Sequence, residues 1–157
     1  MIRVCPALLL LSVAFVVSGC RGRAPYENKS PAQLTRMLED VDPRVQAQGA
    51  LGLSLIGAEA RPAIPVLIEK LKSPDTLVRQ HSALALGHIG PDAGEAVPAL
   101  TDALRDAEWT VRRQAAVALG EIGSAAKPAI APLQKLRRDP NHTVRKASQD
   151  ALAKIRG

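Results

Sequence analysis

The chain has 157 residues, with 21 basic and 15 acidic side chains that give a formal net charge of +6. Aromatic residues make up only 2% of the chain, so a core must be built from Leu, Ile, Val and Ala. Both cysteines, Cys5 and Cys20, lie within the first twenty residues. The remaining chain therefore has no thiol for a disulfide, a zinc site or nucleophilic chemistry.

The N-terminus has the layout of a secretory signal peptide. Arg3 precedes an apolar run that covers residues 4–17. Fourteen helical residues span about 21 Å, whereas the hydrocarbon core of a bilayer is about 30 Å thick. The run is thus short for a membrane-spanning helix and fits the apolar region of a signal peptide. An ordinary signal with a chance cysteine, or an uncleaved anchor, is the alternative interpretation.

The residues that end this run, Val17-Ser18-Gly19-Cys20, resemble the lipobox of bacterial lipoproteins. The resemblance implies a signal peptide over residues 1–19 and lipidation of Cys20, which anchors the chain to a membrane because several acyl chains bind stably. Arg21 stands where an Asp can retain such lipoproteins at the inner membrane. We therefore expect the outer membrane, facing the periplasm, if the organism has one. Residues 20–30 contain Gly and Pro without apolar periodicity, and we interpret them as the lipidated cysteine and its tether.

The rest of the chain is a tandem repeat. The stretch VRRQAAVALGEIG at residues 111–123 recurs as VRQHSALALGHIG at residues 78–90, so the period is 111 − 78 = 33 residues. Eight of the thirteen aligned pairs are identical. Fainter copies cover residues 45–57 and 144–156. A fixed period of this length indicates a repeat array.

Each repeat contains two predicted helices. In residues 111–123 the apolar side chains follow the i, i+4, i+7, i+8, i+11 spacing of a helix. Gly57, Gly90 and Gly123 follow the copies of this motif helix, and we expect them to end it in a left-handed turn. A second apolar helix comes next. We predict an all-α fold over residues 31–157, a right-handed α-solenoid of stacked antiparallel helix pairs with about 3.5 repeats.

The repeat motif is specific for one fold family. The pattern D-x-x-V-R, then A-x-A-L-G-x-I-G, then P-A-I or V-P-A-L resembles the short HEAT repeats of the phycobilisome-lyase type. The resemblance covers roughly residues 31–156. It implies a scaffold that binds proteins, although a few members of that family are enzymes or chaperones.

Three arginines recur at the repeat period: Arg79, Arg112 and Arg145. They form either a basic stripe for nucleic acid or phosphate, or a set of structural pairs with acidic groups or carbonyls at neighbouring turns near Asp75, Asp106 and Asp139. The resemblance favours the structural role, which we assign to the three arginines and to Asp75. Export from the cytoplasm also argues against nucleic acid as a partner.

The sequence offers no catalytic or metal-binding set that we would assign. His81 and His88 lie seven residues apart on one helix, which separates them by about 10.5 Å along the axis, too far to share one ion easily. No nucleophile–base combination or glycine-rich phosphate loop is evident. We expect no cofactor and no enzymatic activity.

Candidate partner-binding residues come from variation between the copies. Trp109 is the only aromatic residue of the array and begins the third motif helix. It is either an exposed anchor for a partner or a cover for the adjacent turn. Solenoids bind along their concave surface, and the resemblance implies that the second helices line it. Six charged positions follow from that expectation: Glu69, Lys70, Asp102, Arg105, Lys135 and Arg138.

Basic residues gather near the C-terminus. They would either contact an acidic partner or a membrane surface, or form a solvent-exposed cap at the end of the array. Taken together, the sequence predicts a monomeric, membrane-anchored lipoprotein of the cell envelope whose HEAT-repeat scaffold mediates protein–protein interaction. A lyase or chaperone of the bilin-lyase kind, and a structural spacer without a specific partner, are the alternatives.

Overall fold

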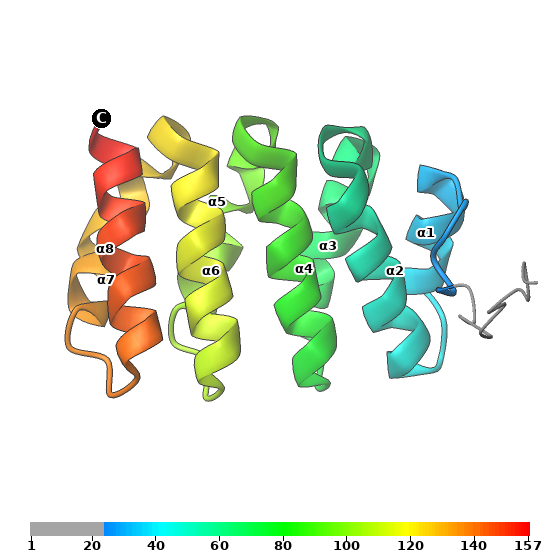
Figure 1. The fold of residues 1–157 in the computed structure, drawn as a ribbon, viewed down its shortest axis with the longest axis horizontal. Helices are drawn as coiled ribbons and strands as arrows, with labels where there is room; N and C mark the ends of the chain where they lie inside the picture. Colours follow the sequence, from blue (N-terminus) through cyan, green and yellow to red (C-terminus); the bar gives the residue numbers. More distant parts are fainter. Residues whose placement is uncertain (1–23) are drawn as a thin grey trace, which may run out of the picture.

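A computed structural model of the protein describes residues 24–157. The predicted signal peptide and Cys20 fall outside these residues. The described chain is built of helices, stacked side by side in chain order (Figure 1). The predicted α-solenoid of helix pairs is confirmed. Its elements are α1 (Pro31–Leu38), α2 (Pro43–Ile56), η1 (Gly57–Ala63), α3 (Ile64–Lys70), α4 (Thr76–Ile89), η2 (Gly90–Ala96), α5 (Val97–Ala103), α6 (Trp109–Ile122), η3 (Gly123–Ala129), α7 (Ile130–Leu136) and α8 (His142–Arg156).

The helices form two layers. The motif helices α2, α4, α6 and α8 make the front layer of Figure 1, and the second helices α1, α3, α5 and α7 lie behind them. Three of the four motif helices start at a capping side chain, because Asp42, Asp75 and Asn141 each accept a hydrogen bond from a backbone N–H of the first turn. Glu108 at the start of α6 makes no such bond. Asp75 therefore caps its own helix, and Arg79 donates to the carbonyl oxygens of Ser73 and Pro74 beside it.

The glycine after each internal motif helix has a positive φ, as the sequence predicts. The conformation is not the left-handed helical turn that we expected, however. Gly57, Gly90 and Gly123 have φ of 56°, 76° and 72° with ψ of −124°, −140° and −132°. Residues with a Cβ avoid this region. The chain then enters the short 3₁₀ segments η1, η2 and η3, which lead into the second helices.

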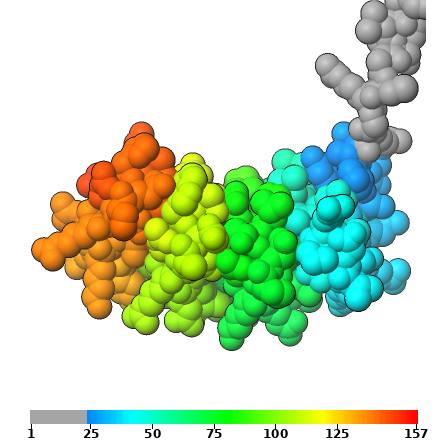
Figure 2. Space-filling view, turned by 90° about the horizontal axis from the view of Figure 1, so that it is seen from below, coloured from blue at the N-terminus to red at the C-terminus, as the bar shows by residue number. Residues whose placement is uncertain are grey.

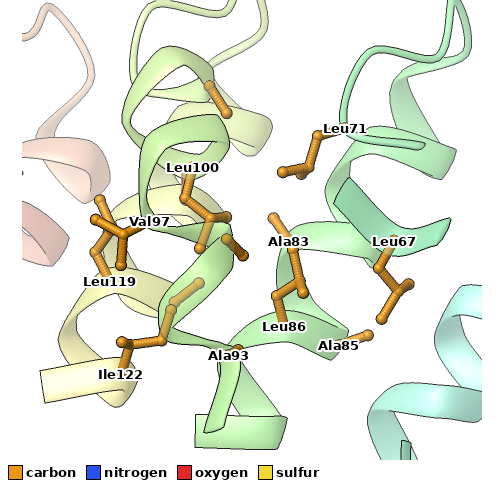
Figure 3. Packing of buried hydrophobic residues seen from close by; sticks show 14 of the residues in the cluster. Leu67, Leu71, Ala83, Ala85, Leu86, Ala93, Val97, Leu100, Leu119 and Ile122 are labelled. Carbon is orange, nitrogen blue, oxygen red and sulfur yellow. The ribbon is translucent and has the colours of Figure 1, made fainter. Parts of the chain in front are cut away.

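One continuous apolar core lies between the two layers. Leu86 and Leu119 from the motif helices meet Leu67 and Leu100 from the second helices, and these four leucines have no exposed surface (Figure 3). Alanines fill the space between them. Burying a leucine side chain contributes about 1.5–3 kcal/mol to stability, so this shared core is what holds successive repeats together.

Neighbouring motif helices approach each other more closely than side chains normally allow. A Cβ added to Gly87 would lie 3.0 Å from the Cα of Ala118, and one added to Gly120 would lie 2.9 Å from the Cα of Ala151. Each motif helix packs along the next one, whereas α3, α5 and α7 pack chiefly on α4, α6 and α8. The closer layer must be the inside of a curved stack. Figure 2 shows the resulting shallow arc.

Two ion pairs join successive repeats on the turn side of the stack. The Nε and Nη2 atoms of Arg79 donate to the carboxylate of Asp106 at 2.8 and 3.0 Å. Arg112 binds Asp139 in the same way, at 2.7 and 3.1 Å. The third nitrogen, Nη1, donates to two carbonyl oxygens of the turn before its own helix, which fixes the guanidinium. We call each such arginine–aspartate pair a rung.

The rungs shift the pKa values of their members. A hydrogen bond from Arg112, and a further one from the backbone of Asn141, lower the pKa of Asp139. Burial alone would raise the pKa of Asp106, but the bonds from Arg79 and from the backbone of Glu108 outweigh it and lower that pKa. The charged forms are therefore the ones that the fold stabilises.

The joint between α2 and α4 has no rung. Gln46 stands in place of the arginine, and its Nε2 donates to the carbonyl of Asp40 at 2.5 Å. Ser73 stands in place of the aspartate and retains only the turn hydrogen bond, from the backbone N–H of Asp75 at 3.2 Å. Neither residue brings a charge to the contact between α2 and α4, which is made by apolar packing and by hydrogen bonds from two histidines of α4 to carbonyl oxygens of α2.

The N-terminal end of the stack is covered by a short turn. Tyr26 packs against the core, and its Cβ lies 2.8 Å from the position of a Cβ added to Gly52. Ala118 and Ala151 occupy the repeat position of Gly52 on later motif helices, and each of them faces the preceding motif helix. Tyr26 thus occupies the place of an absent preceding helix, and the folded part begins before Pro31.

The stretch Pro43–Lys70 is long and apolar enough to cross a membrane by length and composition alone. The fold gives another reason for its composition. The chain turns back at Gly57, and the two halves, α2 and α3, contribute their apolar side chains to the core between the layers.

A substitution at the close helix contact tests the packing. We expect Gly120→Ala to lower the free energy of unfolding by about 1–2 kcal/mol, because overpacking against Ala151 outweighs the gain of about 1 kcal/mol in helix propensity. Gly94→Ala is the matched control, since its Cβ would meet Ala125 at an ordinary 3.5 Å. Urea unfolding followed by circular dichroism measures both. Equal stability of the two variants would contradict the packing argument.

The rungs predict an acid-sensitive stability. Because the folded pKa of Asp139 lies below its unfolded value of about 3.9, its contribution is present above that pH and is lost as the pH falls through the folded pKa. Asp139→Asn should cost about 1–3 kcal/mol at neutral pH and flatten the pH dependence of stability below about pH 4. The control Asp150→Asn, at an exposed site, should change stability by less than about 0.5 kcal/mol. Denaturant titrations across the pH range would contradict the idea if both variants kept the wild-type slope.

Candidate functional site

The concave face is formed by the exposed stripe of each motif helix. On α4 the residues outside the core recur every three or four positions, at Leu77, His81, Leu84 and His88, which is one face of a helix. The buried residues of α4 occupy the opposite face. The equivalent positions on α2, α6 and α8 lie one repeat period away, so the four stripes form one surface. We call it the concave surface.

The concave surface changes character along the stack. Its first half is apolar: Leu55 is 65% exposed and Leu77 is 54% exposed, and Leu51 and Leu84 are partly exposed beside them. The second half carries charge, with Arg113 and Lys146 exposed next to the stripes of α6 and α8, at the repeat position of Gln80. The exposed leucines are not needed for the fold, which makes their cluster a candidate contact surface.

Two hollows lie on this surface. One, of about 560 Å³, is lined by residues of α2 and α4 with Leu55 and His88 among them. The other, of about 530 Å³, lies between α6 and α8 and is lined by Arg113, Val117 and Lys146, among others. Both are open and shallow, and they suit side chains of a protein partner better than an enclosed small molecule.

The two histidines of α4 connect it to α2. The Nδ1 atoms of His81 and His88 lie 3.0 Å and 2.7 Å from the carbonyl oxygens of Ala47 and Ser54. A carbonyl oxygen only accepts, so Nδ1 carries the proton in both rings. The histidines act as links between repeats. Within residues 24–157, no group of three His, Cys, Asp or Glu side chains is placed to hold a metal ion.

The predicted positions on the second helices do not line the concave surface. Six residues are concerned: Glu69, Lys70, Asp102, Arg105, Lys135 and Arg138. They lie near the C-terminal ends of α3, α5 and α7 or in the turns that follow. The prediction that the second helices face the concave side is wrong, because the small residues of the motif helices bring that layer together and leave the second helices on the outer side of the arc.

Trp109 begins α6 and is 43% exposed. It directly precedes Thr110, which occupies the same stripe position as Leu77. Trp109 therefore lies at the N-terminal end of the α6 stripe, which is the rim of the concave surface. The sequence analysis did not identify the apolar residues of the concave surface. A signal for them exists, because Leu55 and Leu84 lie outside the helical periodicity of the buried residues.

The net charge is concentrated at one end of the stack. Residues 122–157 contain eight basic and two acidic side chains, so 8 − 2 = +6, which equals the net charge of the whole chain. Residues 1–121 contain 13 of each sign. The only described ion pair that reduces the exposed basic charge of α8 joins Lys154 to Glu121 at 2.6 Å. The last repeat is thus a strongly basic end.

The comparisons with known proteins agree with this architecture. A family model described as HEAT repeats matches residues 64–153, which is 90 of the 157 residues. A search of curated proteins found no significant match.

Among the solved structures with the same fold are designed and engineered proteins. One engineered protein is 29% identical with a TM-score of 0.69, and the alignment covers 80% of this chain and 62% of that one. A second engineered protein is 26% identical with a TM-score of 0.70, covering 80% and 63%. A designed armadillo repeat protein, solved in complex with the peptide (KR)4, is 21% identical with a TM-score of 0.70, covering 79% and 63%. This chain spans less than two thirds of the length of each of the three.

A HEAT-repeat scaffold of this kind suggests protein–protein interaction. With a family model that matches more than half of its residues, and with two layers of stacked helix pairs at a constant period, the chain belongs to the HEAT repeat family.

Proposed function

We propose that this protein is a lipid-anchored scaffold of the cell envelope that binds a protein partner through its concave surface. The observation that carries the proposal is the set of exposed leucines on α2 and α4, above all Leu55 and Leu77, on the inner side of the arc. Concave surfaces of solenoids present an extended area to a partner. The designed armadillo protein with its bound peptide is an example of a helical solenoid that holds a peptide chain.

The surface suggests the chemistry of the partner segment. Apolar side chains would occupy the hollow beside Leu55 and His88. Acidic side chains would reach the second half, where Arg113 and Lys146 are exposed. Trp109 lies at the rim, where an aromatic ring adds apolar area and an N–H donor. An amphipathic segment with an acidic end fits this arrangement.

The lipoprotein-like N-terminal sequence supports the proposed location in the cell envelope. Val17-Ser18-Gly19-Cys20 would place a lipidated Cys20 at the start of the mature chain. Since the turn around Tyr26 belongs to the folded part, the free tether is shorter than residues 20–30. From Cys20 to Ala24 the chain reaches at most about 14 Å. The N-terminal end of the solenoid would therefore lie next to the bilayer, on the outer membrane if the organism has one.

We assign no catalytic role, because the concave surface brings together leucines and separate charges and not a nucleophile with its base. A lyase or chaperone activity and a spacer role are the competing functions, and the experiment below separates a partner site from a spacer role.

Substitutions in the apolar half of the concave surface test the partner site. A photo-crosslinking residue at Leu84, in protein expressed in its own membranes, should trap one partner. Leu55→Asp and Leu77→Asp together should reduce that crosslink at least about tenfold, since each buried leucine is worth about 1.5–3 kcal/mol. Val41→Asp is the matched control, because Val41 is 97% exposed in the turn before α2. If the double variant has the circular dichroism spectrum of the wild type and still forms the crosslink at the wild-type level, the proposal is wrong and a spacer role is favoured.

The anchor is tested at the cysteine. Cys20→Ser should abolish labelling by radioactive palmitate and move the protein from the membrane to the soluble fraction. Cys5→Ser is the control, because residue 5 would be removed with the signal peptide. This variant should still be labelled and should still be found in the membrane fraction. A Cys20→Ser protein that still carries an acyl group would show that the anchor assignment is wrong.

A further inference from the structure

Arg145 occupies the arginine position of a rung but has no carboxylate. Its Nη1 donates to the carbonyl oxygens of Asp139 and Pro140, both at 2.8 Å. Arg79 and Arg112 make the same two bonds, to the carbonyls six and five residues before them. The guanidinium of Arg145 is thus fixed in the orientation that binds an aspartate twice elsewhere in the same molecule.

The two nitrogens that bind the carboxylate in a rung, Nε and Nη2, make no hydrogen bond from Arg145 to any residue in 24–157. Residues 1–23, which precede the described part, contain no Asp or Glu. The exposed face of α8 is polar: Gln149 and Arg156 stand where α6 has Ala116 and Gly123. That face is not built for a further apolar repeat of the same kind.

The surroundings select an anion. The last 36 residues carry the whole net charge of the chain, and Arg137 and Arg138 are exposed in the turn before α8. A planar guanidinium binds both oxygens of a carboxylate through two parallel N–H bonds, which a lysine cannot do. In both rungs the bound aspartate lies in a turn whose backbone N–H two residues later donates to its Oδ1, at 2.9 and 2.8 Å.

We propose that the basic C-terminal end of the solenoid is a second binding site, at which Arg145 receives an aspartate from a turn of an acidic partner protein and so completes a third rung. This site is separate from the concave surface and does not depend on the function proposed for it.

A second copy of this chain is the less favoured occupant. Asp40 does sit in the required turn, because its Oδ1 accepts from the N–H of Asp42 at 2.9 Å. However, α2 of the second copy would have to pack along α8 to bring that turn to Arg145. Tyr26 covers Gly52, at the place on α2 where the α8 of another copy would have to pack. We therefore assign the carboxylate to a different protein.

The test uses the full chain in detergent micelles and a fluorescent peptide with the sequence of residues 99–110, ALTDALRDAEWT, which contains the Asp106 turn. We expect Arg145→Lys to weaken binding about tenfold, because losing one of two parallel hydrogen bonds costs about 1.4 kcal/mol. Arg138→Lys, a matched change on the same repeat, should alter binding by less than about twofold. In a second peptide, Asn replaces the Asp that corresponds to Asp106. This peptide should bind to wild type as weakly as the original peptide binds to Arg145→Lys.

Nuclear magnetic resonance gives a readout that charge alone would not move. The Nε–H signal of Arg145, identified by its loss in Arg145→Lys, should shift on peptide addition towards the signals of Arg79 and Arg112. No shift, or equal binding by the two Arg→Lys variants, would overturn the proposal. The Leu55→Asp, Leu77→Asp double variant should bind the peptide normally, so failure at one site is distinguishable from failure at the other.

Two further outcomes would show that Arg145 binds something other than an acidic partner protein. If inorganic phosphate, or micelles that contain phosphatidylglycerol, shifts the Arg145 signal as strongly as the peptide does, the site binds phosphate groups and the acidic-protein assignment is wrong. If sedimentation velocity shows self-association that Asp40→Asn abolishes, the occupant is a second copy of the chain.

Discussion

The close contact between neighbouring motif helices is the constraint on which the rest of the structure depends. It is possible because glycine and alanine face each other at Gly87–Ala118 and Gly120–Ala151. This contact draws one layer of helices together and leaves the other layer spread, so the stack bends towards the motif helices (Figure 2). It also brings the turn of one repeat beside the arginine of the preceding one. Curvature, the concave surface and the rungs thus have a common origin.

The core and the proposed partner surface use opposite faces of the same helices. The buried face repeats with little change, since each position must fit its equivalent neighbours in a dense core. The exposed face is free of that requirement. Its central position is Leu51, Leu84, Val117 and then Asp150 along the stack. This progression from apolar to charged gives the concave surface a direction, which a perfectly regular array would not have.

The fold could be predicted from the sequence because a 33-residue period, capping residues and glycines after helices are all local signals. The pairing of Arg112 with an acidic residue near Asp139 was also accessible, because both recur at the same spacing. The inner layer was predicted wrongly. Both helix types are equally periodic, and the choice depends on interhelical distances that only Gly87 and Gly120 indicate. These two glycines indicate a close approach, but its effect on curvature follows from how the two layers pack.

Other features depend on contacts that no periodicity records. Tyr26 lies in a polar, aperiodic stretch, so its role as a cover for Gly52 could not be recognised. The backbone at Gly90 was predicted to have positive φ, which is correct. The value of ψ follows from the 3₁₀ segment after it and not from the glycine itself. Charge asymmetry was visible in the sequence, but the preorganised state of Arg145 required the hydrogen bonds of its Nη1.

The neutral joint between α2 and α4 has a consequence for how the array opens. In a linear stack each interface contributes separately to stability, so disorder starts at the interface with the smallest contribution. Gln46 and Ser73 provide no charge there, and two histidine hydrogen bonds join the helices instead, whereas the two later joints each have an arginine–aspartate pair. The later joints therefore lose an ionic contribution in acid that the first joint does not have. Acid would weaken the stack from its C-terminal side and leave α1, α2 and α4 together the longest.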